Sequence, residues 1–130
     1  MSVDQIPKER TETISLPPRR FEVTTAPKKV VAGSGHDLAL ISGPCVIDSR
    51  ELVLRTAESL VALSEKLNIQ LIFKSSYEKD NRGTEKNWKG PMAEEGLKVL
   101  AEVREKFGVP VLTDVHRVED VPMVAEYVDV

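Results

Sequence analysis

The sequence predicts an α/β fold with a parallel sheet. From Leu38 onward, short apolar segments alternate with longer segments in which apolar residues recur every three or four positions. The short segments contain almost no polar residues, as in strands that are buried on both faces of a parallel sheet. We count three strand–helix units and the opening of a fourth strand at residues 128–130.

An N-terminal extension at residues 1–37 precedes this pattern and is rich in Pro, Thr and charge. Its alternating pieces at residues 21–23 and 30–31 predict a small hairpin, which we expect to close near residues 33–35, Gly-Ser-Gly. The α/β domain itself spans residues 38–130. Its first strand, residues 38–41, is stopped by Gly43-Pro44.

The first helix is expected to start at a capping box made by Asp48 and Glu51 and to run to about Asn68. A second strand at residues 70–75 is followed by a polar loop that reaches Gly90. The remaining predicted elements are a helix at 93–107 with Pro91 at its first position and Gly108 at its end, a strand at 109–115, and a short helix near 119–127.

Composition limits the function classes. The chain has 130 residues, 41% of them hydrophobic, and a formal net charge of −3, so its overall charge does not attract nucleic acid or an anionic membrane. No apolar run approaches the length of a membrane span, and the polar N-terminus lacks the apolar core of an export signal. A single cysteine, Cys45, excludes an internal disulfide. We therefore expect a cytoplasmic location.

Three groups of polar residues follow the three predicted strands. They are Gly43-Pro44-Cys45, the basic segment from Lys74 to Arg82, and Asp114-Val115-His116. Ligands of parallel α/β proteins bind at the carboxyl ends of the strands, so all three groups are expected on one rim. In the basic segment, Lys74, Lys79 and Arg82 suit a small molecule that carries phosphate and carboxylate groups.

Each group also has a structural interpretation. Cys45 is either a small packed side chain or a thiolate ligand for a divalent metal ion. His116 either caps the next helix or takes part in a site. A mixed basic and acidic loop is often only a solvated surface, but Lys74 begins within an apolar strand, where an unpaired ammonium group is costly.

Four ordered blocks resemble the 3-deoxy-D-manno-octulosonate 8-phosphate synthase family. The matching residues are 41–49 (ISGPCVIDS), 73–82 (FKSSYEKDNR), 90–96 with its GP and EEG pieces, and 113–116 (TDVH). The resemblance covers about residues 38–130 and implies the N-terminal part of a (β/α)8 barrel. The family condenses phosphoenolpyruvate with D-arabinose 5-phosphate and water, releases phosphate, and supplies lipopolysaccharide synthesis.

The resemblance implies roles for particular residues. Lys79 and Asp114 are the implied catalytic residues, and the implied substrate-binding residues are Lys74, Ser76, Lys79, Asn81 and Arg82. Because metal-dependent members of the family carry Cys where metal-independent members carry Asn, Cys45 is the implied ligand of a divalent ion such as Zn, Fe or Mn. The family also implies small-molecule substrates and a homo-oligomer, commonly a tetramer.

The chain departs from the family pattern in two respects. Gly83-Thr84 stands where members commonly have two small hydroxyl residues, and the family's other metal ligands belong to later strands that we expect beyond Val130. We therefore expect the 130-residue chain alone to be an incomplete barrel and inactive. Two alternatives stay open: the related synthase that uses erythrose 4-phosphate, and a truncated chain that acts only as a binding or interaction piece.

Overall fold

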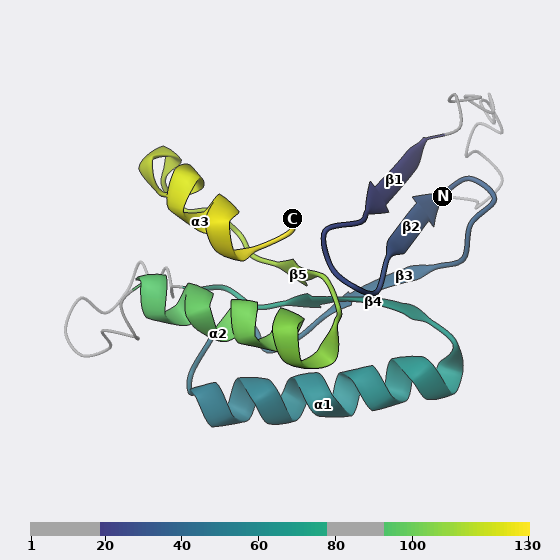
Figure 1. The fold of residues 1–130 in the computed structure, drawn as a ribbon, viewed down its shortest axis with the longest axis horizontal. Helices are drawn as coiled ribbons and strands as arrows, with labels where there is room; N and C mark the ends of the chain where they lie inside the picture. The colour runs from purple at the N-terminus through teal and green to yellow at the C-terminus, as the bar shows by residue number, and fades with distance from the viewer. Residues whose placement is uncertain (1–18, 78–92) are drawn as a thin grey trace, which may run out of the picture.

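The structure, a computed structural model, describes residues 19–77 and 93–130. In this part of the chain, three parallel strands form one sheet in the order β3 (Ala39–Ser42), β4 (Gln70–Lys74) and β5 (Val111–Leu112). Two helices, α1 (Arg50–Leu67) and α2 (Ala93–Phe107), lie on the same face of this sheet (Figure 1). The predicted α/β class with a parallel sheet is confirmed.

The core between the helices and the sheet follows from the alternation of side chains along each strand. Leu71 and Phe73 of β4 point toward the helices and pack in one buried cluster with residues of α1, α2 and β5. Ile72, between them in sequence, packs in a different cluster on the other face. Lys74 lies two residues beyond Ile72, so it belongs to that second face.

Helix α1 begins one residue later than the predicted capping box requires. The N-cap is Ser49, whose hydroxyl accepts a hydrogen bond from the backbone N–H of Leu52 at 3.2 Å, so the prediction of Asp48 as the cap was wrong. The helix ends at Asn68, which adopts the left-handed conformation with φ 52°. Helix α2 has the predicted bounds and is followed by Gly108, also left-handed at φ 71°.

The third strand is shorter than the predicted 109–115. Only Val111 and Leu112 pair as strand β5, and the chain then continues through the short 3-10 helix η2 (Val118–Asp120) into α3 (Val121–Tyr127). Residues 128–130 are not a strand. They nevertheless lie along β5, because the N–H groups of Asp129 and Val130 both donate to the carbonyl of Val111, at 3.0 and 3.3 Å.

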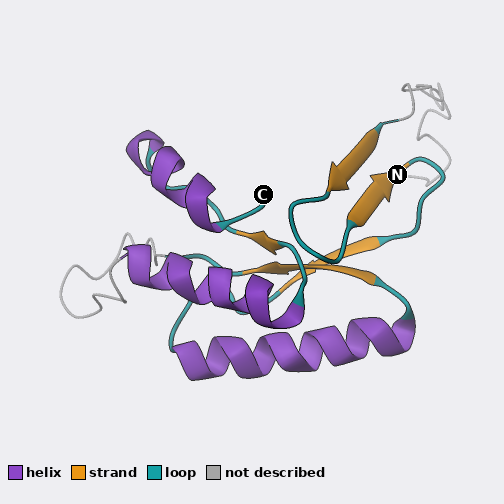
Figure 2. Cartoon of the chain, viewed as in Figure 1, coloured by secondary structure: helices purple, strands orange, loops and turns teal. Residues whose placement is uncertain are grey.

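The N-terminal hairpin pairs β1 (Arg20–Val23) with β2 (Val30–Gly33) in antiparallel register (Figure 2). Because Val23 is opposite Val30, the connection consists of residues 24–29, and the predicted closure at residues 33–35 was wrong. Gly33 instead ends β2. A Cβ atom at this position would lie 2.0 Å from the carbonyl oxygen of Arg19, and the φ of 130° also favours glycine.

The hairpin covers the amino-terminal end of the sheet. The side-chain amide of Gln70, the first residue of β4, accepts from the N–H of Val31 at 2.7 Å and donates to its carbonyl at 2.8 Å. Val23 and Val30 pack on Ile72 in the second cluster. One end of the second face is therefore closed by the hairpin, and the polar residues lie at the other end.

Candidate functional site at the carboxyl ends of the strands

The three segments that follow β3, β4 and β5 meet around Ser76. The backbone N–H of Ser76 donates to the carbonyl of Cys45 at 3.2 Å, and its carbonyl accepts from the N–H of Ile47 at 3.1 Å. These bonds extend the parallel pairing of β3 and β4 past their ends through a bridge between Val46 and Ser76. The Ser76 side chain contacts Asp114 of the third segment.

Lys74, Ser76 and Asp114 form one polar cluster. The Lys74 ammonium donates to the hydroxyl of Ser76 at 2.9 Å, and this hydroxyl donates to Oδ1 of Asp114 at 2.5 Å. The ammonium also lies 3.4 Å from the same carboxylate oxygen. Lys74 and Ser76 share a face because they are two residues apart on an extended chain, as the sequence predicted.

Opposing effects act on the pKa of Asp114. Burial raises it, but the hydrogen bond from Ser76, a backbone hydrogen bond within Asp114, and the charges of Lys74 and His116 together lower it. The net result is a pKa below the ordinary value for aspartate, so the carboxylate is ionised at neutral pH. The side chain of Asp114 is 47% exposed and that of Lys74 is 29% exposed, which leaves both within reach of a ligand.

His116 and Tyr77 adjoin this cluster. Nε2 of His116 lies 3.5 Å from Oδ2 of Asp114, and its ring meets the ring of Tyr77 edge-on with 5.3 Å between centroids. The buried Tyr77 hydroxyl donates to Asp120 at 2.8 Å. Sequence reasoning missed Tyr77 and Asp120. The available signal was a tyrosine directly after Ser76, where strand alternation turns the side chain toward the helices.

Cys45 has only part of what a metal site requires. It is a free, exposed cysteine, and its backbone lies beside Ser76. Within residues 19–77 and 93–130, no three His, Cys, Asp or Glu side chains are grouped so that they could hold a metal ion. The described residues therefore offer one candidate thiolate ligand and do not make a metal site by themselves.

The other sequence-predicted residues of the basic segment, Lys79, Asn81 and Arg82, lie outside the described residues. Their roles stay predictions. Of the seven different candidate residues, the structure brings together Lys74, Ser76 and Asp114 through side chains and adds Cys45 through its backbone.

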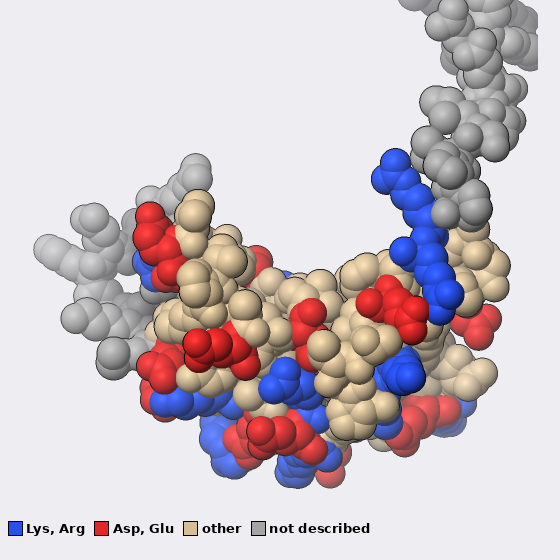
Figure 3. Space-filling model, turned by 45° about the horizontal axis from the view of Figure 1, so that its top comes forward, with Lys and Arg blue, Asp and Glu red and all other residues tan. Residues whose placement is uncertain are grey.

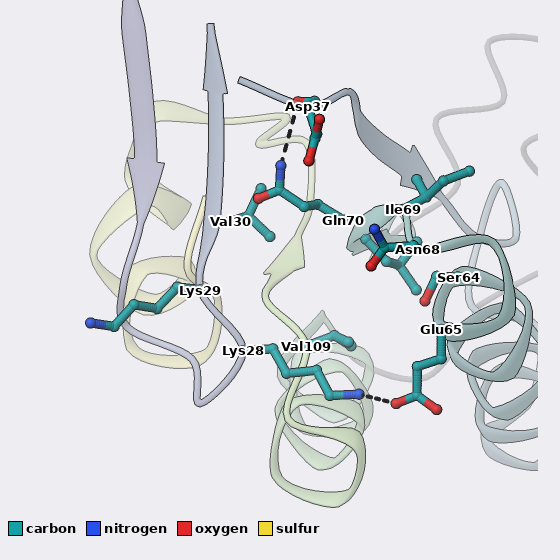
Figure 4. Close-up of a pocket in the computed structure, with 11 residues that line it drawn as sticks. Lys28, Lys29, Val30, Asp37, Ser64, Glu65, Asn68, Ile69, Gln70 and Val109 are labelled. Carbon is teal, nitrogen blue, oxygen red and sulfur yellow. Dashed lines mark hydrogen bonds and ion pairs between the residues drawn. The ribbon is translucent and has the colours of Figure 1, made fainter. Parts of the chain in front are cut away.

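A cavity of about 260 Å³ lies at the opposite end of the sheet, between the hairpin and the end of α1 (Figure 4). Its cation Lys28 already pairs with Glu65 at 2.6 Å, and the side chain of Lys29 points away from the cavity. Gln70, also in its lining, is bonded to the hairpin backbone. Lys28 and Gln70 of this cavity therefore serve to attach the hairpin.

Charge on the visible surface is mixed. Figure 3 shows Lys and Arg side chains interspersed with Asp and Glu over most of the visible face, without a large area of one sign. Among the described residues, no helix combines the length and the apolar character needed to cross a membrane.

A parallel strand–helix sheet with a Lys–Ser–Asp cluster at the carboxyl ends of its strands defines an α/β protein whose site lies where such folds bind ligands. Comparison with known families is more specific. Residues 12–130 match the family model described as the DAHP synthetase I family. The chain belongs to this family.

Curated relatives of the chain carry a name different from that of the family model. The chain is 52% identical over 99 residues to the 2-dehydro-3-deoxyphosphooctonate aldolase of Acidithiobacillus ferrooxidans, which covers 76% of this chain and 35% of the relative. The proteins of the same name from Citrifermentans bemidjiense and Bordetella bronchiseptica are 46% and 50% identical over 84% and 75% of this chain, and 39% and 34% of their own lengths. The chain thus spans little more than a third of the length of these relatives. The predicted resemblance to octulosonate phosphate synthases is confirmed.

Proposed function

We propose that this chain carries one wall of the active site of a 3-deoxy-D-manno-octulosonate 8-phosphate synthase. The reaction condenses phosphoenolpyruvate with D-arabinose 5-phosphate and water and releases inorganic phosphate. The observation that carries the proposal is the Lys74–Ser76–Asp114 cluster at the carboxyl ends of parallel strands. The names of the relatives support the choice of substrates.

The described residues suit two parts of this chemistry. The Lys74 ammonium has three N–H donors, only one of which Ser76 accepts, so it can also hold a phosphate or carboxylate oxygen of phosphoenolpyruvate, which carries both groups. The Ser76 hydroxyl can donate to the same substrate when it rotates away from Asp114. Asp114 holds these donors in place before the substrate enters, and its carboxylate lies within hydrogen-bond reach of protons on Ser76 and Lys74.

The bond-forming step joins the methylene carbon of phosphoenolpyruvate to the aldehyde carbon of the sugar phosphate, while water adds to the other end of the enol double bond. Positive groups that face the substrate offset the charge that develops in this step. We propose that Lys79, Asn81 and Arg82 add further cationic and amide groups to this wall, with Lys79 and Asp114 nearest to the reacting carbons.

Two features of the complete enzyme are part of the proposal. The three strand–helix units are proposed to be the N-terminal part of a (β/α)8 barrel, with α1 and α2, which cover one face of the sheet (Figure 1), on its outside. A divalent metal ion is proposed to bind Cys45. Because the described residues supply only this one candidate ligand, none of the steps above depends on the metal.

The experiment uses the complete polypeptide encoded by the gene. With phosphoenolpyruvate and arabinose 5-phosphate, we expect phosphate release and an eight-carbon phosphate product, detected by mass spectrometry. Lys74→Met should lower kcat/KM at least about a hundredfold, since the half-buried ammonium that pairs with Asp114 and faces the substrate is lost. The matched control Lys98→Met removes an exposed lysine of α2 that pairs with Glu94 and Glu95, and it should leave the rate unchanged.

The related reaction with erythrose 4-phosphate is the competing assignment, because the matched family model is described by the name of that synthase. Each sugar phosphate is therefore assayed separately. Turnover with erythrose 4-phosphate alone would overturn the proposed substrate. Absence of turnover with both would favour a non-catalytic interaction piece.

A further inference from the structure

The segment that carries Asp114 is attached to the core through Tyr77. Tyr77 follows Ser76 directly and is only 1% exposed, in a cluster with Leu97 of α2 and Val124 of α3. Helix α2 approaches it closely at Gly96, where a Cβ atom would lie 3.1 Å from the Tyr77 carbonyl oxygen. The ring is therefore fixed by packing on two helices.

The hydroxyl of this fixed ring makes two contacts with the segment that follows β5. It donates to Oδ2 of Asp120 at 2.8 Å and accepts from the backbone N–H of His116 at 3.4 Å. Arg117 donates to the same carboxylate oxygen of Asp120 at 3.1 Å. Residues 116 and 120 are thus attached to one buried oxygen atom at the end of β4.

His116 extends this attachment to the site. Its ring packs edge-on against Tyr77, and its Nε2 lies 3.5 Å from the Asp114 oxygen that faces away from Lys74 and Ser76. Asp114 is consequently contacted on both carboxylate oxygens, by the β4 cluster on one side and by His116 on the other. A phenylalanine at position 77 would fill the same volume but would have no oxygen to bind residues 116 and 120.

We propose that Tyr77 is a positioning residue, whose hydroxyl fixes the segment of residues 114–120 so that Asp114 faces Lys74 and Ser76. Its effect on turnover rests on the proposed function, whereas its effect on the order of this segment does not. Loss of the hydroxyl should therefore lower kcat more than it changes KM, since Lys74 at the end of β4 and Ser76, which bridges to Val46, keep their places.

The test uses the complete polypeptide and the variant Tyr77→Phe. Hydrogen–deuterium exchange, read by mass spectrometry on the peptide covering residues 113–120, should become several-fold faster while exchange in α1 stays unchanged. We expect kcat to fall about tenfold with less than a twofold change in KM for phosphoenolpyruvate.

Three further variants separate positioning from general stability. Tyr127→Phe is the matched control, because it removes a tyrosine hydroxyl that makes an exposed hydrogen bond to Glu94 of α2, and it should leave both measurements unchanged. Asp120→Ala should reproduce Tyr77→Phe. Asp120→Asn keeps an acceptor oxygen and should restore most of the protection.

Equal behaviour of Tyr77→Phe and Tyr127→Phe would overturn the proposal. So would faster exchange throughout the protein, because that result means Tyr77 contributes only to overall stability. If the unaltered protein shows no condensation, the proposed function fails, and the exchange measurement still decides whether Tyr77 fixes this segment.

Discussion

Asp114 illustrates how single residues set the properties of the site. Its carboxylate receives the Ser76 hydroxyl and the Lys74 ammonium on one oxygen and faces His116 with the other. Each of these groups favours the charged form, and together they outweigh the burial that opposes it. The pKa of Asp114 is therefore a direct measure of whether the cluster is assembled.

We predict that Lys74→Met raises the pKa of Asp114 toward its ordinary value of about 3.9. A carboxylate with a lowered pKa stabilises the fold above the unfolded-state value and loses this contribution as the pH falls through the folded-state value. The loss thus occurs below about pH 4 in the unaltered protein. Carbon-13 NMR of the Asp114 carboxyl group measures the shift. Lys98→Met is the control, and equal titration curves for both variants would contradict the prediction.

Cys45 carries the second prediction at this scale. In the complete polypeptide, Cys45→Ser should weaken binding of Zn²⁺ or Mn²⁺ at least tenfold, because a hydroxyl is a much poorer ligand than a thiolate. Metal content after dialysis against a weak chelator measures the loss. Ser42→Ala, which leaves the thiol in place, is the control, and unchanged metal content in Cys45→Ser would mean that the cysteine only packs.

At the scale of elements, the junction of β3 and β4 depends on a glycine. A Cβ atom on Gly43 would lie 1.9 Å from the carbonyl oxygen of Lys74, so any side chain forces the two strand ends apart. We predict that Gly43→Ala lowers the free energy of unfolding by about 3 kcal/mol. Urea denaturation followed by circular dichroism measures this change. Ser42→Ala, one residue earlier, should cost less than about 1 kcal/mol.

The attachment of the hairpin gives a further prediction. Gln70→Met keeps the side-chain length but leaves the N–H and carbonyl of Val31 without their partner, which costs about 1–3 kcal/mol. We expect limited proteolysis to cut residues 24–29 faster in this variant. Lys28→Met breaks only the exposed ion pair with Glu65 and should have little effect, since exposed pairs contribute at most about 1 kcal/mol.

The bounds of helices and strands were predicted accurately where the sequence signal lies within the element itself. Helix α2 was predicted to the residue because its apolar periodicity and the glycine after it are both local. The predicted hairpin closure was wrong because residues 33–35, with two glycines, are a stronger local turn signal than residues 24–29. In the structure, the pairing of Val23 with Val30 places the turn at residues 24–29 despite this signal. Strand β5 was predicted too long because an apolar run does not show where its partner strand ends.

Site prediction from sequence worked where strand alternation applies. Placing Lys74 and Ser76 on one face requires only the two-residue period of an extended chain, and the structure confirms that arrangement. For Ser76 and Asp114, the sequence predicted only that both lie on the same rim of the sheet, and not that they are in contact. The bonds from Tyr77 to Asp120 and His116 were not predicted, because they join segments about 40 residues apart without a periodic signal.

At the scale of the whole molecule, the sheet has an exposed apolar side. Leu38 directly precedes β3 and is 78% exposed, and Ile41 lies within β3 and is 55% exposed. Strand β3 is an edge strand of the described sheet. Such an edge favours pairing with another strand. We predict that the 130-residue chain self-associates and releases no phosphate from phosphoenolpyruvate and arabinose 5-phosphate.

Sedimentation velocity and a phosphate assay test this prediction. Ile41→Lys should shift the chain toward the monomer, whereas Leu63→Lys, which changes an exposed leucine of helix α1, should not. A monomeric chain, or turnover by this chain alone, would contradict the prediction. Turnover that a chelator abolishes would show that copies of the chain assemble a metal site between them.

The order of the strands in the sheet is also their order in the chain. Each strand therefore pairs with the strand that the ribosome made just before it, and the early strand–helix units can assemble in turn while synthesis continues. Val130 continues this order, because it follows β5 in the chain and bonds to Val111 of β5. The hairpin precedes these strands in the chain and covers their amino-terminal ends, so during translation it shields apolar side chains of the growing sheet at one end.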